Sequence, residues 1–424
     1  MKFIFADGLD MIDPKYNFIE DRPDEDRDGY WSDQYPHEHF RTPPYDGVLI
    51  SRGIVGDDLF PGKYTSSMAM RFRRIGARAF LRMNNERLGH LPIFGDCGAF
   101  SYAEMDEPPY TVDMMLDFYA DGQFTHGCSV DHIIFDFDAN AKNMKGGSPS
   151  TRKRFDITLE NAAEFLKSSR HLGRSFTPLG VAQGWSPSSI GEAARRLEKM
   201  GYKYLAIGGL VPLRAEQIHL CLRAIREKIS PATKLHLLGF AKADQIHQFV
   251  GYRIESFDST SPLRRAFKDA KANYYSATGK NTLDYHTAIR IPHPTENSRL
   301  KKKAKSKGVD QDELLMLDRK AMSSLRDYDR GRTTIDRCVD TVMAYSREFL
   351  WVDGKSPREN RLAMTKSEVA LRRTLSDRPW KQCKCRVCRE VSIEAMIFRG
   401  SNRNKRRGFH NLQVFYRHIK QWLR

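Results

Sequence analysis

Short apolar runs alternate with longer amphipathic stretches through the middle of the chain. Each apolar run is too short for a helix and is typical of a buried strand. Strands are predicted at 47–51, 91–94, 132–137, 177–182, 204–207, 235–240 and 254–257. Amphipathic helices are predicted between them at 66–83, 111–119, 158–169, 188–200, 215–229 and 243–250. This alternation indicates parallel strands joined by right-handed helical crossovers.

The number of alternations favours a closed barrel. At least seven strands are predicted between residues 47 and 258, one short of a (β/α)8 TIM barrel. An open doubly wound sheet is the alternative, but no G-x-G-x-x-G motif opens any of the predicted helices. The predicted fold class is therefore α/β, with a TIM-barrel catalytic core over 46–264.

Polar residues or glycines stand where the predicted strands end. These are Asp96, Asp136, Gln183, Gly208 and Asp258. In a barrel the carboxyl ends of the strands meet on one face, and that face carries the active site. Asp258 taken alone could equally cap a helix or belong to a turn. Its place in a series of polar strand ends favours catalysis.

Three further segments flank the predicted barrel. Residues 1–45 are rich in Asp, Pro and aromatic residues and are expected to form an irregular N-terminal extension. Residues 265–378 are expected to form a basic helical insertion, with helices at 310–326 and 333–350 and a K-K-K-A-K-S-K-G run at 301–308. That run is either a solvated basic face or a nucleic-acid clamp that uses Lys301, Lys302 and Lys303. Residues 379–424 are expected to form a metal-binding subdomain with a C-terminal helix.

The charge of the chain indicates a polyanionic partner. The 424 residues carry a formal net charge of +17, more than solubility requires, and nucleic acid is the usual partner of such proteins. No run of 18 apolar residues predicts a membrane span. The acidic N-terminal sequence lacks a signal-peptide layout, and seven cysteines do not form a paired framework, so a reducing cytoplasm is expected.

Three of the cysteines form the clearest metal motif of the chain. Cys383, Cys385 and Cys388 lie within six residues, and His410 follows in the predicted C-terminal helix. Three thiolates and one imidazole match a closed tetrahedral zinc site. Because such a set leaves no open coordination position, the zinc is expected to be structural.

Taken together, these motifs resemble those of the guanine transglycosylases, the queuine tRNA-ribosyltransferase superfamily. The similar segments are G-D-C-G-A-F at 95–100, F-D at 135–136, G-V-A-Q-G at 180–184, A-I-G-G-L at 206–210, the nucleophile region at 239–262 and the C-x-C-x-x-C…H zinc motif. The resemblance covers about 90–260 and 379–420.

The resemblance implies a base exchange by double displacement. Asp258 would attack C1′ of the nucleoside, and Asp96 would carry the proton of the leaving and entering bases. Asp136 would bind the guanine N1–H and N2–H groups. The other residues implied to hold the base are Gln183, Gly208, Gly209 and Leu210. The target base would have to be flipped out of its stack, and no ATP or redox cofactor is required.

Two departures favour the DNA-modifying branch over the tRNA enzymes. Over a hundred residues separate Asp258 from the zinc cysteines, and no archaeal-type RNA-binding domain follows them. DNA is therefore the expected substrate and tRNA the alternative, with helper proteins of a DNA-modification system as possible partners. In the bacterial tRNA enzymes that this chain resembles, a glutamate shortly after G-G-L can offset the charge of an aminomethyl base. Arg214 matches that position here, which favours the nitrile 7-cyano-7-deazaguanine (preQ0) as the entering base. A non-catalytic nucleic-acid-binding adaptor is the remaining alternative, but a cluster of carboxylates does not help to bind a polyanion.

Overall fold

A closed barrel of eight parallel strands forms the first part of the structure, a computed structural model that describes residues 1–277, 283–307 and 310–422. The strands neighbour one another in chain order from β1 to β8, and β8 pairs with β1 to close the barrel. They are β1 (Lys2–Ala6), β2 (Gly47–Ser51), β3 (Ile93–Asp96), β4 (His126–Cys128), β5 (Thr177–Ala182), β6 (Tyr204–Ile207), β7 (Lys234–Leu237) and β8 (Ser256–Ser259). The predicted (β/α)8 TIM barrel is confirmed.

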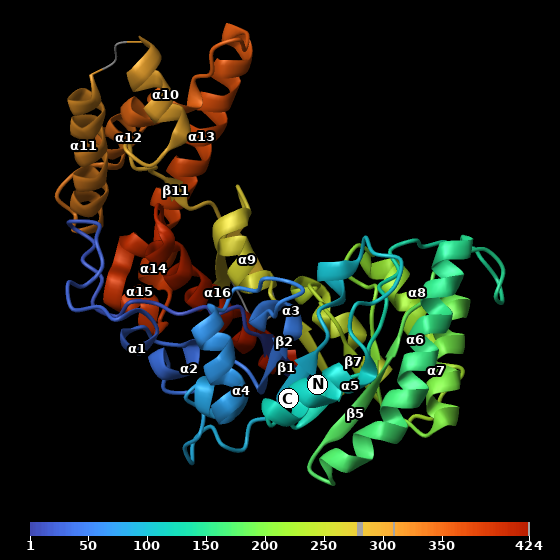
Figure 1. Ribbon diagram of the computed structural model, residues 1–424. Helices are drawn as coiled ribbons and strands as arrows, with labels where there is room; N and C mark the ends of the chain where they lie inside the picture. Colours follow the sequence, from blue (N-terminus) through green and yellow to red (C-terminus); the bar gives the residue numbers. More distant parts are fainter. Residues whose placement is uncertain (278–282, 308–309, 423–424) are drawn as a thin grey trace. The chain divides into compact units, whose positions relative to one another are not determined.

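Helices follow the strands and cover the outside of the barrel (Figure 1). They are α3 (Arg52–Val55), α4 (Ser66–Phe80), α5 (Val112–Asp121), α6 (Pro149–Ser168), α7 (Pro187–Met200), α8 (Ala215–Arg226) and the 3-10 helix η3 (Ala243–Tyr252). Side-chain oxygens of Thr65, Thr111, Ser148 and Ser186 accept backbone N–H bonds at the starts of α4 to α7. These caps satisfy donors that the first turn of a helix leaves unpaired.

Two strands lie outside the ranges that the sequence predicts. Residues 2–6 form β1, although 1–45 was expected to be irregular, because the apolar run that ends at Ala6 fits between β2 and β8. Strand β4 lies at His126–Cys128, and 132–137 is not a strand. In the segment 132–137, Ile133 and Ile134 are buried but do not pair with any strand of the barrel. Their hydrophobicity therefore reflects burial rather than strand pairing.

The barrel interior is filled by side chains that alternate along the strands. Ile4, Leu49, Phe94, Leu179 and Val181 are among its buried apolar residues. Alternate residues of a strand point to the same face, so the polar residues at the strand ends continue these inward rows at one mouth of the barrel. The sequence therefore places its polar groups above a packed apolar core.

A second compact unit combines Met11–Pro44 with Ser261–Gln421, while Met1–Asp10 and Tyr45–Thr260 belong to the barrel unit. This division differs from the expected one, in which the insertion and the metal-binding subdomain were separate. The predicted helices at 310–326 and 333–350 correspond to α11 (Gln311–Asp329) and α12 (Ile335–Leu350). The other helices of the unit are α1 (Gly29–Ser32), α2 (Pro36–His39), α9 (Ser261–Lys268), α10 (Ser298–Lys307), α13 (Pro357–Asp377), α14 (Pro379–Gln382), α15 (Arg386–Val391), η4 (Ser392–Met396) and α16 (Ser401–Trp422). Its strands are β9 (Tyr274–Ala277), β10 (Leu283–His286), β11 (Ile289–Arg290) and β12 (Ile397–Phe398).

Buried ion pairs tie the N-terminal part of the second unit to its C-terminal part. Asp21 accepts from both Arg399 and Arg403. The Arg403 side chain is fully buried, and its Nε also lies 2.8 Å from Oε2 of Glu394. The Arg399 Nη1 lies 2.5 Å from Oδ1 of Asp318 on α11. Buried guanidinium groups require such partners, because removing one partner leaves an uncompensated charge.

Candidate active site

Asp258 lies near the carboxyl end of β8 and is 7% exposed. Its Oδ1 accepts a hydrogen bond from the Gly239 backbone N–H at 3.0 Å and lies 3.2 Å from Nε2 of His236. Within the described residues, the other oxygen, Oδ2, accepts no hydrogen bond. One oxygen of the carboxylate is therefore held in place while the other is available to react.

Asp96, the last residue of β3, is a candidate proton carrier. The pKa of its carboxyl is raised to about 7, first by burial and then by the nearby charges of Asp131 and Asp258, while hydrogen bonds from Ser51 and the Gly98 N–H act in the opposite direction. Asp96 Oδ2 accepts that Gly98 N–H bond at 3.2 Å. A carboxyl group with a pKa near neutrality can both donate and accept a proton at working pH.

Asp131 is the carboxylate that sequence reasoning missed. It is 2% exposed and follows β4 by three residues. Its Oδ2 accepts from Nε2 of Gln183 at 2.6 Å, and its Oδ1 accepts from the Cys97 thiol at 3.1 Å. Burial raises its pKa. The apolar run that follows Asp131 could have indicated this residue, because it marks a buried segment, but the run was predicted to be a strand that ends at Asp136.

Asp136 lies in a different environment from Asp131. Its side chain is exposed, and its Oδ2 accepts from Oγ1 of Thr151 in the first turn of α6 at 2.5 Å. The structure thus brings Asp131, and not Asp136, into contact with Gln183. The assignment of 132–137 to a strand had placed Asp136 at a strand end.

The remaining residues predicted to hold the base surround Gln183. Gln183 is 2% exposed, and its Oε1 accepts the Ile134 N–H at 3.4 Å. Gly208 and Gly209 leave space beside it: a Cβ on Gly208 would collide with the Gln183 amide, and a Cβ on Gly209 would lie 3.1 Å from Oε1. Gly209 also has φ +71°, which favours glycine. Leu210 is 1% exposed, so its side chain belongs to the core.

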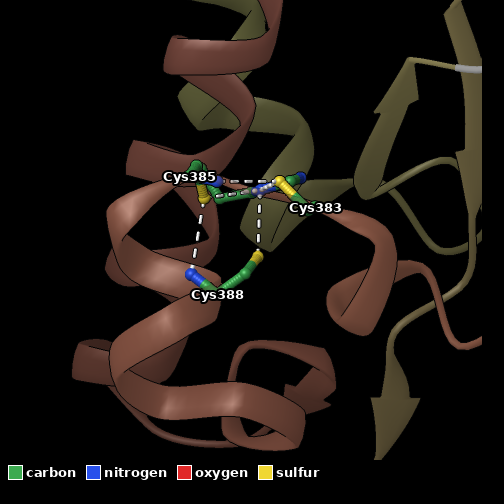
Figure 2. Close-up of side chains that lie close together, drawn as sticks. Cys383, Cys385 and Cys388 are labelled. Atoms are coloured by element: carbon green, nitrogen blue, oxygen red, sulfur yellow. Dashed lines mark hydrogen bonds between the residues drawn. The ribbon is translucent and has the colours of Figure 1, made fainter.

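The four predicted metal ligands converge in the second unit. One ligand atom from each of Cys383, Cys385, Cys388 and His410 lies within 4.8 Å of the others. Figure 2 shows the three cysteines around a common point at the loop between α14 and α15 and the first turn of α15. His410 on α16 turns Nδ1 toward the sulfurs, 3.3 Å from Sγ of Cys385 and of Cys388.

The surroundings of the cluster fit a bound metal. His410 Nε2 donates to the Tyr275 carbonyl oxygen at 2.7 Å, which fixes the tautomer with Nδ1 free to ligate. The Tyr274 ring stacks on the imidazole with centroids 3.9 Å apart. Backbone N–H groups of Cys385 and Cys388 point at Sγ of Cys383 and Cys385, both at 3.4 Å, as they would toward thiolates. The donor set can hold a metal such as zinc.

Comparison with known proteins decides the family. No protein-family model matches this chain. A DNA-guanine transglycosylase from Salmonella montevideo is 38% identical to it over 426 residues, which cover 100% of the chain and 97% of that relative. This chain belongs to the DNA-guanine transglycosylases. The predicted resemblance is confirmed, and the chain is a guanine transglycosylase rather than a non-catalytic adaptor.

The predicted basic contacts of this transglycosylase lie on α10. Lys301 and Lys302 are exposed, whereas Nζ of Lys303 lies 2.5 Å from Oε2 of Glu348 on α12. Gly308, at the end of the basic run, lies outside the described residues. Lys303 is therefore engaged with Glu348, and Lys301 and Lys302 are the more exposed of the three lysines. Among the helices of the described ranges, none combines the length and apolar character needed to span a membrane.

Proposed function

We propose that this protein exchanges guanine in DNA for a 7-deazaguanine base through a covalent Asp258 intermediate. The observation that carries the proposal is the state of the two carboxyl groups. Asp258 is held through Oδ1 with Oδ2 unengaged, while Asp96 has a pKa of about 7 and lies close enough to be affected by its charge. A fixed nucleophile beside an acid/base group is what double displacement at a glycosidic carbon needs.

In the first half-reaction, Oδ2 of Asp258 attacks C1′ of a guanosine unit from the face opposite the base. The C1′–N9 bond breaks, its electron pair leaves with guanine, and Asp96 in its neutral form supplies the proton that the base takes up. The products are a glycosyl ester on Asp258, free guanine and an ionised Asp96. The guanosine must be flipped out of the duplex to reach a barrel mouth.

The second half-reaction reverses these steps with the entering base. N9 of the 7-deazaguanine attacks C1′ while its proton passes to the Asp96 carboxylate, and the Asp258 ester bond breaks. Two inversions at C1′ retain the configuration. The proton count closes, because Asp96 begins and ends the cycle neutral.

Base recognition is proposed for the group around Gln183. Asp131 orients the Gln183 amide, and Gly208 and Gly209 keep the neighbouring space clear. The entering base is proposed to be 7-cyano-7-deazaguanine, since Arg214, the exposed residue before α8, would repel an aminomethyl ammonium group. Zinc is proposed for the Cys383–His410 cluster, with a structural role because four protein ligands fill its coordination.

DNA is proposed as the substrate because the relative that matches the full chain is a DNA-guanine transglycosylase. The test supplies radiolabelled 7-cyano-7-deazaguanine with duplex DNA or with tRNA in parallel, adding any partner proteins to both. Label is expected in DNA with the wild type and in neither polymer with Asp258→Asn, which keeps the shape of the side chain. Label in tRNA alone would refute the DNA assignment. Incorporation of the labelled base by Asp258→Asn at the wild-type rate would refute the assignment of Asp258 as the nucleophile.

A further inference from the structure

A buried chain of polar groups runs through the barrel interior and ends on Asp258. The Tyr204 hydroxyl on β6 lies 2.5 Å from Oγ of Ser256 on β8. The same Oγ lies 2.5 Å from Nδ1 of His236 on β7, whose Nε2 lies 3.2 Å from Oδ1 of Asp258. Parallel register sets His236 beside Ser256, and Asp258 follows Ser256 by two residues on the same inward face.

One arrangement of protons gives every contact of this chain a donor and an acceptor and faces the Asp258 carboxylate with an N–H. Burial raises the pKa of Tyr204, so its hydroxyl keeps its proton and donates to Ser256 Oγ. Ser256 then donates to Nδ1 of His236, and the remaining ring proton sits on Nε2 and points at the Asp258 carboxylate. The reverse tautomer would set an Nε2 lone pair against that carboxylate. The chain therefore fixes His236 as a donor to Asp258.

The environment of His236 leaves it little freedom. His236 and Ser256 are 0% exposed and Tyr204 is 4% exposed. The imidazole stacks against Phe94, with ring centroids 5.2 Å apart. Polar side chains in a barrel core cost free energy unless every hydrogen bond is made, and here each is made in a sequence that ends at the reacting group. A simple apolar residue would fill the same space without that cost.

We propose that His236 is a positioning residue for the nucleophile, oriented by Ser256 and Tyr204; this inference rests on the proposed function. Its N–H and that of Gly239 hold Oδ1 and direct Oδ2 toward C1′. Once Oδ2 has formed the glycosyl ester, Oδ1 is the ester carbonyl oxygen and keeps both donors. When the entering base breaks the ester, both donors stabilise the charge that returns to the carboxylate. One pair of donors thus serves both half-reactions.

The test measures formation of the covalent DNA adduct in a single turnover without an entering base. His236→Phe keeps the stack on Phe94 but removes the donor, and His236→Gln places an amide N–H near the former Nε2. With His236→Phe the rate constant of adduct formation is expected to fall about 10- to 100-fold, the loss of one bond to a charged group. His236→Gln is expected to recover most of that loss, with the KM for DNA unchanged in both variants.

A second set of variants removes the orienting groups. Tyr204→Phe and Ser256→Ala release the His236 tautomer and are expected to slow adduct formation several-fold, also without a change in KM. Tyr202→Phe is the matched control, because Tyr202 is a buried tyrosine two residues before Tyr204 whose hydroxyl donates to the Ala162 carbonyl oxygen instead. It is expected to keep the wild-type rate.

The outcomes separate this inference from the proposed function. Equal rates for His236→Phe and His236→Gln, or a wild-type rate per active molecule in His236→Phe, would overturn the positioning role while leaving the nucleophile assignment intact. If neither His236 variant folds, an undiminished rate in both Tyr204→Phe and Ser256→Ala overturns it. A wild-type enzyme without any Asp258-dependent adduct would overturn both proposals.

Discussion

The carboxyl groups at the barrel mouth differ in environment although they share one residue type. Asp258 is fixed by two donors through one oxygen, Asp96 has a pKa near neutrality, and Asp131 is buried between Gln183 and Cys97. Sequence position could predict that strand-end carboxylates meet, but it could not rank them. Burial, neighbouring charge and hydrogen bonding distinguish the carboxyl group proposed to attack from the one proposed to move a proton and from the one that contacts the Gln183 amide.

The raised pKa of Asp96 predicts a pH-dependent stability effect. The unfolded carboxyl has the ordinary value of 3.8 and the folded one about 7, so the folded state retains a proton that the unfolded state loses. The contribution of this protonated carboxyl to the free energy of unfolding is fully present below pH 3.8 and is lost as the pH rises through 7. Asp96→Asn should therefore raise the melting temperature relative to wild type at pH 8, by roughly 2–4 °C per kcal/mol, and by much less at pH 4.

Thermal unfolding of both proteins at the two pH values checks this, with Asp136→Asn as an exposed control. Equal shifts at pH 4 and pH 8 would contradict the raised pKa. Asp96→Asn should also lose base exchange, since an amide cannot carry the proton between the two bases.

Asp131 and Asp136 can be separated by paired substitutions. Asp131→Asn turns an acceptor that orients Gln183 into a mixed donor and acceptor, so we expect the KM for the entering base to rise about 10-fold or more. Asp136→Asn changes an exposed group bonded to Thr151 and should alter that KM by less than about threefold. Steady-state exchange kinetics measure the KM of both variants. A larger rise in KM for Asp136→Asn than for Asp131→Asn would indicate that Asp136 binds the base.

At the scale of elements, α14, α15 and α16 come together at the four residues that could hold a metal. Two short helices and one long helix meet where Cys383, Cys385, Cys388 and His410 converge. Helices as short as α14 have little stability of their own. The spacing of the cysteines predicted this cluster, because ligand geometry is local and does not depend on the rest of the fold.

Removing one ligand should release the metal and loosen these helices. Cys383→Ala is expected to lower bound zinc from one per chain to well below one and to expose α14 and α15 to protease, since a structural metal contributes folding free energy directly. Elemental analysis and limited proteolysis measure the two effects. Cys221→Ala is the matched control, because Cys221 is a buried cysteine of α8 in the barrel unit. A wild-type protein without zinc would contradict the assignment.

The basic run on α10 should bind the DNA backbone through two of its three predicted lysines. A Lys301→Ala, Lys302→Ala double variant should weaken DNA binding and reduce the slope of log K against log salt by about 1 to 2 units. Lys303→Ala should lower stability through loss of the Glu348 pair and leave the salt slope unchanged. Fluorescence anisotropy at several salt concentrations measures the slopes, and an unchanged slope in the double variant would exclude α10 from the DNA contact.

At the scale of the whole molecule, the alternation of apolar runs and helices predicted the barrel but not the composition of the second unit. The pattern is local, so six of the eight barrel strands and most crossover helices could be predicted from it, whereas β1 and β4 could not. The pairing of Asp21 with Arg399 and Arg403 could not, because nothing in either segment specifies a partner hundreds of residues away. The strand β1 was not predicted because its short apolar run is followed by a long segment rich in acidic residues, Pro and aromatic residues, which is typical of irregular structure.

The closing of the barrel by β1 and β8 has a consequence for biosynthesis. Strand β1 is synthesised before β2 to β7, whereas its partner β8 at Ser256–Ser259 follows only after those strands. Asp21 is synthesised long before its partners Arg399 and Arg403, which follow β8 in the chain. The nascent chain must therefore hold the apolar strand β1 and the Asp21 carboxylate without these partners while the intervening segments are synthesised. An apolar strand without its neighbour is prone to aggregate, so this interval is one in which the nascent chain would benefit from a chaperone.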